Sequence, residues 1–334
     1  MMPTEPQQFT PDERAVLGRF WHPVAYAEEL TAQPLQAELL DLELVLWRGP
    51  GGIAVALDQC PHRGSRLSSG WVSHGELVCP YHGLHFAADG RCTRVPAQDA
   101  QTLISPRLKL ATVSTAERYG LVWVCLSGTP VLPLPEWPAL EAAGNQRYLA
   151  RTDWQASAGR HVENFNDIAH FAWAHAGTFG ARERPRLLPE QLEETPGGLR
   201  RRTRVAQVER DTFTDEALIG EAEYLYEFAF PFASSLQIAY PTLGHEWIFD
   251  AVCPIAPARS RIFILKARDY GQDQPLADWV AFQDAVNEED RVVVEAQRPR
   301  AVPLDLQAEA HIAADAWSLA FRRRWRAFGL DRAV

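Results

Sequence analysis

The residues best suited to chemistry form two short motifs, Cys-Pro-His at residues 60–62 and Cys-Pro-Tyr-His at residues 79–82. Thiolate and imidazole are the side-chain groups that most often bind transition metals in proteins. Two Cys-Pro dipeptides that each lead to a histidine are hard to explain as a coincidence of four unrelated residues. The block therefore predicts a metal centre, and the order of its ligands indicates which kind.

Three interpretations of this block compete. A zinc site with two cysteines and two histidines uses the same ligands, but zinc fingers keep the cysteines in one pair and the histidines in the other. In a Rieske [2Fe–2S] cluster, two cysteines bind one iron and two histidines bind the other. With Cys60 and His62 in one motif and Cys79 and His82 in the other, each motif supplies one ligand to each iron. We therefore favour the cluster over zinc or coincidence.

A second group of metal-binding side chains lies in the other half of the chain. Asp167, His170 and His175 interrupt an otherwise apolar segment that we expect to be helical over residues 156–176. Asp167 and His170 would share a helix face, whereas His175 would lie about 140° around the helix from His170. If both histidines bind one ion, the helix must bulge or end near residues 174–177. A histidine on an apolar face is more often a hydrogen-bonded core residue, but the upstream motif favours metal binding.

A ferrous site with two histidines is completed by a carboxylate. A helix expected over residues 276–297 offers Glu288, Glu289 and Asp290. Only one of these acids falls on the apolar stripe of that helix, which consists of Phe282, Val286, Asp290, Val293 and Val294. A buried carboxylate needs a positive partner, which Fe(II) would supply. We therefore predict that Asp290 completes the site, and that the two glutamates belong to a solvated face.

The first block resembles a known signature. Residues 60–64 (Cys-Pro-His-Arg-Gly) and 79–83 (Cys-Pro-Tyr-His-Gly) look like the Rieske motif. One departure is Leu84, where the family usually carries Trp. We expect this change to alter the packing of the loop and to leave the ligands intact.

The second block extends the resemblance to nearly the whole chain. Asn164, Asp167, His170 and His175 look like the Asn/Asp-x-x-His-x-x-x-x-His motif of Rieske non-heme iron oxygenase α-subunits, in the aromatic ring-hydroxylating oxygenase superfamily. Residues 289–297 are similar to the segment that carries the iron-binding aspartate. In pattern, the chain most resembles terminal oxygenases of the dicamba and vanillate O-demethylase and purine-alkaloid N-demethylase type.

The resemblance implies a reaction and its cofactors. Electrons from NAD(P)H would arrive through a separate reductase or ferredoxin, and the [2Fe–2S] cluster would pass them to a mononuclear Fe(II) that uses O2. The product would be a hydroxylated small aromatic or heterocyclic molecule, or formaldehyde where an O- or N-methyl carbon is attacked. Two alternatives stay open: an aromatic-ring cis-dihydroxylating dioxygenase, and a Rieske electron carrier fused to a non-catalytic ligand-binding module.

The resemblance also implies an assembly. It gives Asp167 a bridging role, with hydrogen bonds to His170 and to a cluster histidine of a neighbouring subunit. Electron transfer would then cross the interface of a head-to-tail ring, hence a homotrimer. Asn164 resembles the family asparagine near the iron; simple packing beside the ligands is the alternative.

The elements that must position these residues fall into two domains. Short strands and turns up to about residue 127 favour an all-β Rieske domain over residues 1–135. A proline-rich linker follows at about residues 127–138. Residues 136–334 combine strands with helices over 156–176, 276–297 and 305–329. This predicts the α+β class, with a helix-grip-like catalytic domain in which helices cover an antiparallel sheet.

We expect the substrate pocket between this sheet and the two iron-bearing helices. A largely apolar pocket with few polar groups suits an aromatic or heterocyclic substrate. The candidate lining residues are mostly aromatic, a type that more often simply fills a core: Phe165, Phe171, Trp173, Phe232, Gln237, Tyr240 and Trp247.

Composition sets the outer limits. With 334 residues, 46% apolar and 23% charged, the chain is typical of a soluble globular protein of more than one domain. A net charge of −10 argues against nucleic acid or an anionic membrane as partner, and we see neither a transmembrane segment nor a signal peptide. Cys92, Cys125 and Cys253 are expected to be buried free thiols, which fits a cytoplasmic location.

Overall fold

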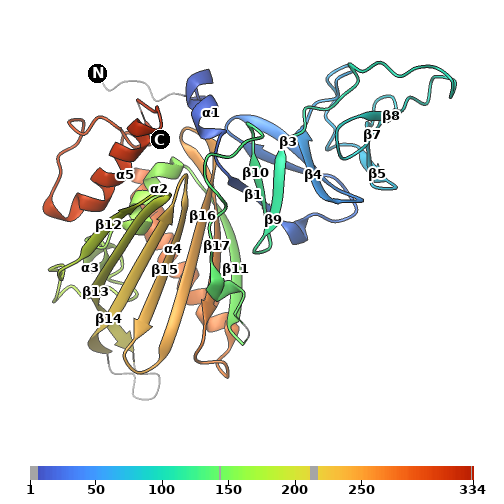
Figure 1. Ribbon diagram of the computed structural model, residues 1–334. Coiled ribbons are helices and arrows are strands. Elements are labelled where there is room, and N and C mark those ends of the chain that lie inside the picture. The colour runs from blue at the N-terminus through green and yellow to red at the C-terminus, as the bar shows by residue number, and fades with distance from the viewer. Residues whose placement is uncertain (1–6, 143, 211–216, 332) are drawn as a thin grey trace. The chain divides into compact units, whose positions relative to one another are not determined.

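The computed structural model describes residues 7–142, 144–210, 217–331 and 333–334. These residues divide into two compact units: Gln8–Pro133 form one, and Leu134–Val334 together with Gln7 form the other. Each unit forms its own sheets (Figure 1). Within the described ranges, no helix is long and apolar enough to cross a lipid bilayer.

The first unit is a β-domain with one short helix, α1 (Pro11–Leu17), before its first strand. Its strands form three small antiparallel sheets in the orders β1-β10-β9, β2-β3-β4 and β5-β6-β7-β8, which confirms the predicted all-β class. The other elements are β1 (His22–Tyr26), η1 (Ala27–Glu29), β2 (Leu35–Leu39), β3 (Leu42–Gly49), β4 (Gly52–Leu57), β5 (Trp71–Ser73), β6 (Glu76–Val78), β7 (His85–Phe86), β8 (Cys92–Arg94), β9 (Ser114–Arg118) and β10 (Leu121–Cys125).

Local sequence explains these elements. Thr10 and Glu13 form a reciprocal capping box at the start of α1, because each side chain binds the backbone N–H of the other. All five residues of β10 are buried, as its continuous apolar run predicts. The predicted hairpin between β3 and β4 forms, and Gly52 adopts a φ of +119° that favours glycine at this turn.

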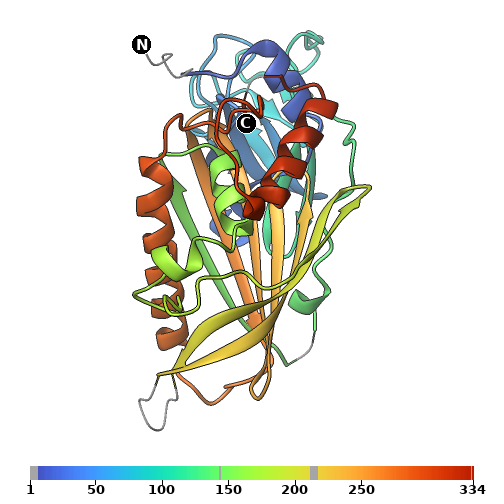
Figure 2. The ribbon, with the colours of Figure 1, turned by 90° about the vertical axis from the view of Figure 1, so that its left-hand side faces the viewer.

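The second unit is built on one seven-stranded antiparallel sheet in the order β11-β17-β16-β15-β14-β13-β12. Helices α2, α4 and α5 lie on one side of this sheet (Figure 2). The elements are η2 (Pro138–Leu140), β11 (Gln146–Trp154), α2 (Ala158–Asn166), α3 (Phe171–Ala174), β12 (Gln191–Thr195), β13 (Gly198–Arg210), β14 (Ala217–Ala229), β15 (Ala233–Tyr240), β16 (Gly244–Ala256), β17 (Arg259–Arg268), α4 (Leu276–Ala296), η3 (Ala313–Asp315) and α5 (Ala316–Ala327).

The period of two along each strand decides which side chains turn toward the helices. Tyr224 and Tyr226 of β14 stand opposite Ile238 and Leu236 of β15, and all four belong to one apolar cluster. Because neighbouring residues point to opposite faces, Gln237 lies on the far side of the sheet from this cluster. The α+β class predicted for this half of the chain is confirmed.

Two predicted helices are wrong in extent. The helix expected over residues 156–176 ends at Asn166, because Asp167 is extended and its carboxylate accepts the backbone N–H groups of Ala169 and His170. Such local bonds replace helix continuation. The helix expected over residues 305–329 is helical only as α5, preceded by the short η3. The third, α4, is confirmed.

A buried ionic network holds α2 in place. Arg322 of α5 donates two hydrogen bonds to the Glu163 carboxylate, at 2.7 and 2.8 Å. Glu309 accepts from both Arg160 and Arg322, at 2.6 and 2.7 Å. Paired arginine forks of this kind fix geometry as well as charge. The network therefore orients the helix whose C-terminus leads directly to Asp167.

Candidate active site

The two Cys-His motifs form loops with the same backbone pattern. In the first, Cys60 N–H donates to Ser65 O and Gly64 N–H donates to Cys60 O, both at 2.8 Å. In the second, Cys79 N–H donates to Leu84 O at 2.9 Å and Gly83 N–H donates to Cys79 O at 3.0 Å. The two glycines have φ of +72° and +65°, a region that favours glycine. The loops are therefore equivalent although their histidines stand at different positions.

The side chains of these loops form a pair of thiols and a pair of imidazoles. Cys60 and Cys79 are buried, whereas His62 and His82 are exposed and their ring centroids lie 4.6 Å apart. Burial is the main cause that raises the pKa of Cys60 to about 11, so this thiol stays protonated at neutral pH unless a metal takes the proton's place. Paired sulfur donors inside and paired nitrogen donors outside fit a [2Fe–2S] cluster with its histidine iron toward the surface.

Leu84, the departure from the family pattern, is 2% exposed and belongs to the apolar core behind the loops. Its carbonyl closes the second loop by accepting from Cys79. The residue thus packs in the core behind the second loop.

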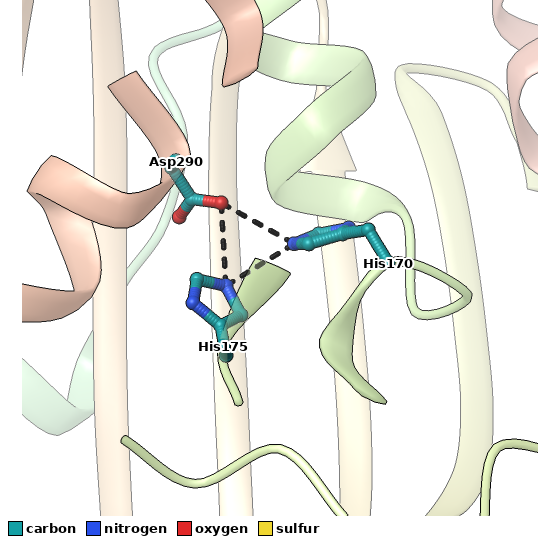
Figure 3. A group of neighbouring side chains, drawn as sticks. All are labelled: His170, His175 and Asp290. Carbon is teal, nitrogen blue, oxygen red and sulfur yellow. Dashed lines mark hydrogen bonds and ion pairs between the residues drawn. The ribbon is translucent and has the colours of Figure 1, made fainter. Parts of the chain in front are cut away.

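Three side chains converge in the second unit (Figure 3). Nε2 of His170 lies 3.2 Å from Nε2 of His175, and Oδ1 of Asp290 lies 3.3 and 3.2 Å from these two nitrogens. His170 and His175 flank the short helix α3, and Asp290 comes from α4. The break after α2, which was not predicted at this point, is what turns both rings to one side.

Carboxylates behind the two rings determine their tautomers. Nδ1 of His170 donates to Asp167 and Nδ1 of His175 donates to Glu289, each at 2.9 Å. In a neutral imidazole the other nitrogen then carries a lone pair. Two such lone pairs and one carboxylate oxygen meet at the centre of the triangle, which is a site for a cation.

The spacing and charge of the site fit a divalent ion. Two ligands about 2.1 Å from an ion and at roughly right angles lie about 3 Å apart. Protons on the two Nε2 atoms would otherwise take the place of the ion: the rings then donate to Asp290, and these hydrogen bonds outweigh burial and hold the pKa of this carboxyl well below its usual range. Burial likewise opposes charge on His170, but Asp167 and Asp290 raise its pKa to about 9. Two histidines and one carboxylate with open positions are typical of ferrous oxygenase sites.

Asn164 lies beside the site. Its Nδ2 donates to Oδ1 of Asp290 at 3.1 Å, so it contacts a candidate ligand and not the centre of the triangle. Among the hydrogen bonds of the described residues, the Asp167 carboxylate accepts only from groups of its own turn: the backbone N–H groups of Ala169 and His170 and the ring of His170.

A cavity of about 390 Å³ opens beside the three side chains, between the sheet and helices α2 and α4. Of the candidate lining residues, Phe165, Phe171 and Tyr240 lie on its wall. The other four expectations are wrong. Gln237 and Trp247 stand opposite each other on neighbouring strands, with their side chains on the far face of the sheet. Trp173 is 60% exposed. Phe232 is buried against Trp325.

Sequence reasoning missed Glu289, which was expected in a solvated face. It also placed Phe282 and Val293 on the buried stripe of α4, but these are 45% and 44% exposed, and the buried positions are Trp279, Gln283 and Val294. The available signal was adjacency: Glu289 precedes the candidate ligand, and a carboxylate behind a histidine ligand is a common arrangement. A polar group around Lys266, described below, was also missed.

Comparison with known proteins now identifies the family. Residues 20–114 match the Rieske [2Fe-2S] domain, and residues 154–329, over half of the chain, match the vanillate O-demethylase oxygenase C-terminal domain. The chain belongs to the Rieske non-heme iron oxygenases. Methylxanthine N1-demethylase NdmA of Pseudomonas putida is 32% identical over 328 residues, which cover 93% of this chain and 89% of NdmA.

Other Rieske oxygenases support the same assignment. The oxygenase component of dicamba O-demethylase from Stenotrophomonas maltophilia is 29% identical over 312 residues, with 84% and 88% of the two chains covered. The solved structure of Pseudomonas putida NdmA with caffeine superposes with a TM-score of 0.83 at 30% identity, covering 94% of this chain and 92% of that one.

As a Rieske oxygenase, the chain is an oxidoreductase: the terminal component that uses a [2Fe–2S] cluster, a mononuclear iron and O2. Electrons reach such components from a reductase or ferredoxin. The zinc interpretation and the non-catalytic electron carrier are thereby excluded. Its relatives include demethylases of methylxanthine, vanillate and dicamba and the oxygenase subunit of a 3-chlorobenzoate-3,4-dioxygenase.

Proposed function

We propose that this chain removes a methyl group oxidatively from a small N-methylated heteroaromatic molecule. The observation that carries the proposal is the cavity of about 390 Å³, whose wall combines the three converging ligands with aromatic side chains. A planar ring of one or two cycles suits this space. The extent of similarity to a methylxanthine N-demethylase, 93% of the chain, favours an N-methyl over an O-methyl group.

The proposal assigns a role to each candidate residue. Cys60, His62, Cys79 and His82 hold the cluster. His170, His175 and Asp290 hold the mononuclear iron, which supplies O2 activation when bound. The converging lone pairs and the paired loops support these assignments. The division into a Rieske domain, residues 1–135, and a catalytic domain, residues 136–334, belongs to the same proposal, supported by the two compact units.

The remaining residues orient groups and exclude water. Asp167 and Glu289 hold the two imidazoles in the tautomer that binds metal. Asn164 holds Oδ1 of Asp290 in place. Phe165, Phe171 and Phe179 keep the cavity wall apolar. The overall reaction consumes O2, two electrons and two protons, converts the methyl C–H to C–OH and releases water; the N-hydroxymethyl product then breaks its C–N bond to give formaldehyde and an N–H group.

We also propose a homotrimer in which Asp167 bridges His170 to a cluster histidine of the next subunit. The Asp167 side chain is 31% exposed although it binds an iron-ligand candidate that is 16% exposed. It therefore connects the metal site to the surface. His62 and His82 are exposed in turn, so a neighbouring copy could bring one of them to this carboxylate. The ring closes if the interface is heterologous.

A cytoplasmic location completes the proposal. The five cysteines are thiols, and Cys92, Cys125 and Cys253 are buried as expected. A reducing compartment keeps thiols in this state and supplies NAD(P)H to the reductase.

The test is a substrate screen of the purified holoenzyme with a surrogate reductase and NADH. Caffeine, theobromine, vanillate and dicamba are offered, and formaldehyde and ring products are followed by mass spectrometry. Stoichiometric formaldehyde from an N-methylxanthine supports the proposal. A cis-diol product would instead favour the dioxygenase alternative, and formaldehyde from vanillate or dicamba alone would move the assignment to O-demethylation. His170→Ala should lose mononuclear iron while the EPR signal of the reduced cluster persists.

A further inference from the structure

A buried lysine lies behind two polar residues of the cavity wall. Lys266 of β17 is 0% exposed, and its Nζ lies 2.5 Å from Oε1 of Glu246 and 2.8 Å from Oε1 of Gln283. Glu246 also accepts from Tyr270 Oη at 2.9 Å and Trp279 Nε1 at 3.2 Å. The ammonium is therefore held between fixed partners. Glu246 and Gln283 both line the cavity.

Lys266 determines the orientation of two amides. An ammonium only donates, so the oxygen of the Gln283 amide must face it. The NH2 group of Gln283 then points the other way and donates to Oδ1 of Asn287 at 2.7 Å. The oxygen of Asn287 is thereby turned toward Gln283, and the NH2 group is the donor that this amide can offer to a ligand. Asn287 lines the cavity as well.

Asn287 lies close to the site of oxidation. It precedes Asp290 by three residues on α4, which is about 4.5 Å along the helix axis and nearly the same face. The cavity wall also contains the apolar side chains of Phe165, Phe171 and Phe179. An amide donor in such a wall discriminates strongly, since a ligand group that cannot accept leaves it unpaired.

We propose that Asn287 determines substrate specificity: its N–H group binds a hydrogen-bond acceptor on the substrate ring, and Lys266, acting through Gln283, sets that polarity. The inference rests on the proposed function and adds to it the substrate class, an N-methylated ring with a carbonyl oxygen or an unsubstituted ring nitrogen near the methyl group. Asn287 binds the substrate, and Gln283 and Lys266 are positioning residues.

The test compares two probes of nearly equal shape. 1-Methylbenzimidazole has a ring nitrogen acceptor where 1-methylindole has a C–H group. Dissociation constants are measured by calorimetry on the holoenzyme without O2, at pH 8. Wild type should bind the benzimidazole about 5- to 10-fold more tightly, the value of one neutral hydrogen bond. Equal binding of the two probes by wild type would overturn the proposal.

Variants separate binding from positioning. Asn287→Leu should bring the ratio to about one, chiefly by weakening the benzimidazole. Gln283→Leu leaves Asn287 in place but frees its amide to turn, so the ratio should fall here too. Gln237→Leu, on the far face of the sheet, is the matched control and keeps the wild-type ratio. If Asn287→Leu keeps the wild-type ratio of dissociation constants, the donor role of Asn287 is refuted. If Gln283→Leu keeps that ratio, the positioning role of Gln283 is refuted.

Formaldehyde release is measured separately, so the two proposals fail separately. If the benzimidazole binds preferentially but neither probe yields formaldehyde, N-demethylation is refuted and the donor role of Asn287 stands. If both probes yield formaldehyde and bind with equal dissociation constants, N-demethylation stands and the donor role of Asn287 is refuted. Each variant is first shown to retain the wild-type melting temperature and the EPR signal of its cluster.

Discussion

Glu289 lies behind His175 and accepts a hydrogen bond from Nδ1 of the ring at 2.9 Å. Thr178 donates to the same oxygen of Glu289 at 2.8 Å, so the carboxylate is itself held in place. Asp167 has the same relation to His170. Each imidazole of the site thus has its own carboxylate, one from the loop before α3 and one from α4.

Replacing Glu289 should weaken iron binding. Glu289→Leu removes the acceptor that fixes the tautomer of His175, and the loss of such a partner typically lowers metal affinity about 10- to 100-fold. Iron content after dialysis against a chelator, with cluster EPR as internal reference, measures the effect. Glu288→Gln is the matched control. Glu288 is exposed and pairs with Arg291, so this substitution should leave the iron content unchanged. Equal iron retention by both variants would show that Glu289 does not support the site.

Asp167→Asn should retain both metals and block turnover. The amide oxygen can take the place of Oδ2 and accept from the backbone and ring N–H groups of His170, so the turn and the tautomer of the ring are kept while the bond from Ala169 is lost. The amide lacks the charge that stabilises His170 and that would connect the two metal centres across subunits. Single-turnover kinetics of a prereduced cluster, with metal analysis, distinguishes this from simple iron loss. Product formation at the wild-type rate would disprove the bridging role.

Gly180→Ala should disrupt the mononuclear site selectively. A Cβ at Gly180 would lie 2.2 Å from Phe171 O and 2.9 Å from His175 O, and neither backbone oxygen can move without moving the ligand loop. We expect loss of iron with cluster absorbance retained. Gly197→Ala is the control, since nothing lies within 4 Å of a Cβ added there and iron should stay bound. Full iron occupancy in Gly180→Ala would contradict this account.

The Rieske unit should lose stability as pH falls from 6.5 to about 4. His22 is fully buried, and burial is the main cause that lowers its pKa to about 4, although its ring donates to Leu17 O. In the unfolded chain His22 takes up a proton near pH 6.5, whereas in the folded unit it does so only near pH 4. The free energy of unfolding is therefore unaffected by this group above pH 6.5 and falls by about 3 kcal/mol in total as the pH drops to about 4.

Hydrogen exchange of β1 and β10 at pH 6.5, 5.5 and 4.5 measures this loss. His22→Gln should remove most of the pH dependence, because it deletes the titrating group. His245→Gln, at an exposed position in the second unit, should not. A wild-type profile that is flat over this range would show that His22 is not the group involved.

Residue types and short spacings were sufficient for the chemistry. The order of cysteines and histidines predicted the cluster, and helical phase selected Asp290 from three adjacent acids. Both depend on covalent neighbours, so they can be read from the chain. Strands rich in aromatic and β-branched residues, such as β16 and β17, were predicted for the same reason.

Tertiary structure alone decided what surrounds these residues. Periodicity shows that Leu236 and Gln237 face opposite ways but not which of them faces the helices, and that choice excluded Gln237 from the cavity. Glu289 looked solvated until α4 packed beside α3. The amide of Asn287 has a direction only because Lys266, from a strand outside α4, is buried against Gln283. Each of these facts arises from contacts between segments far apart in sequence, whose mutual packing no local pattern encodes.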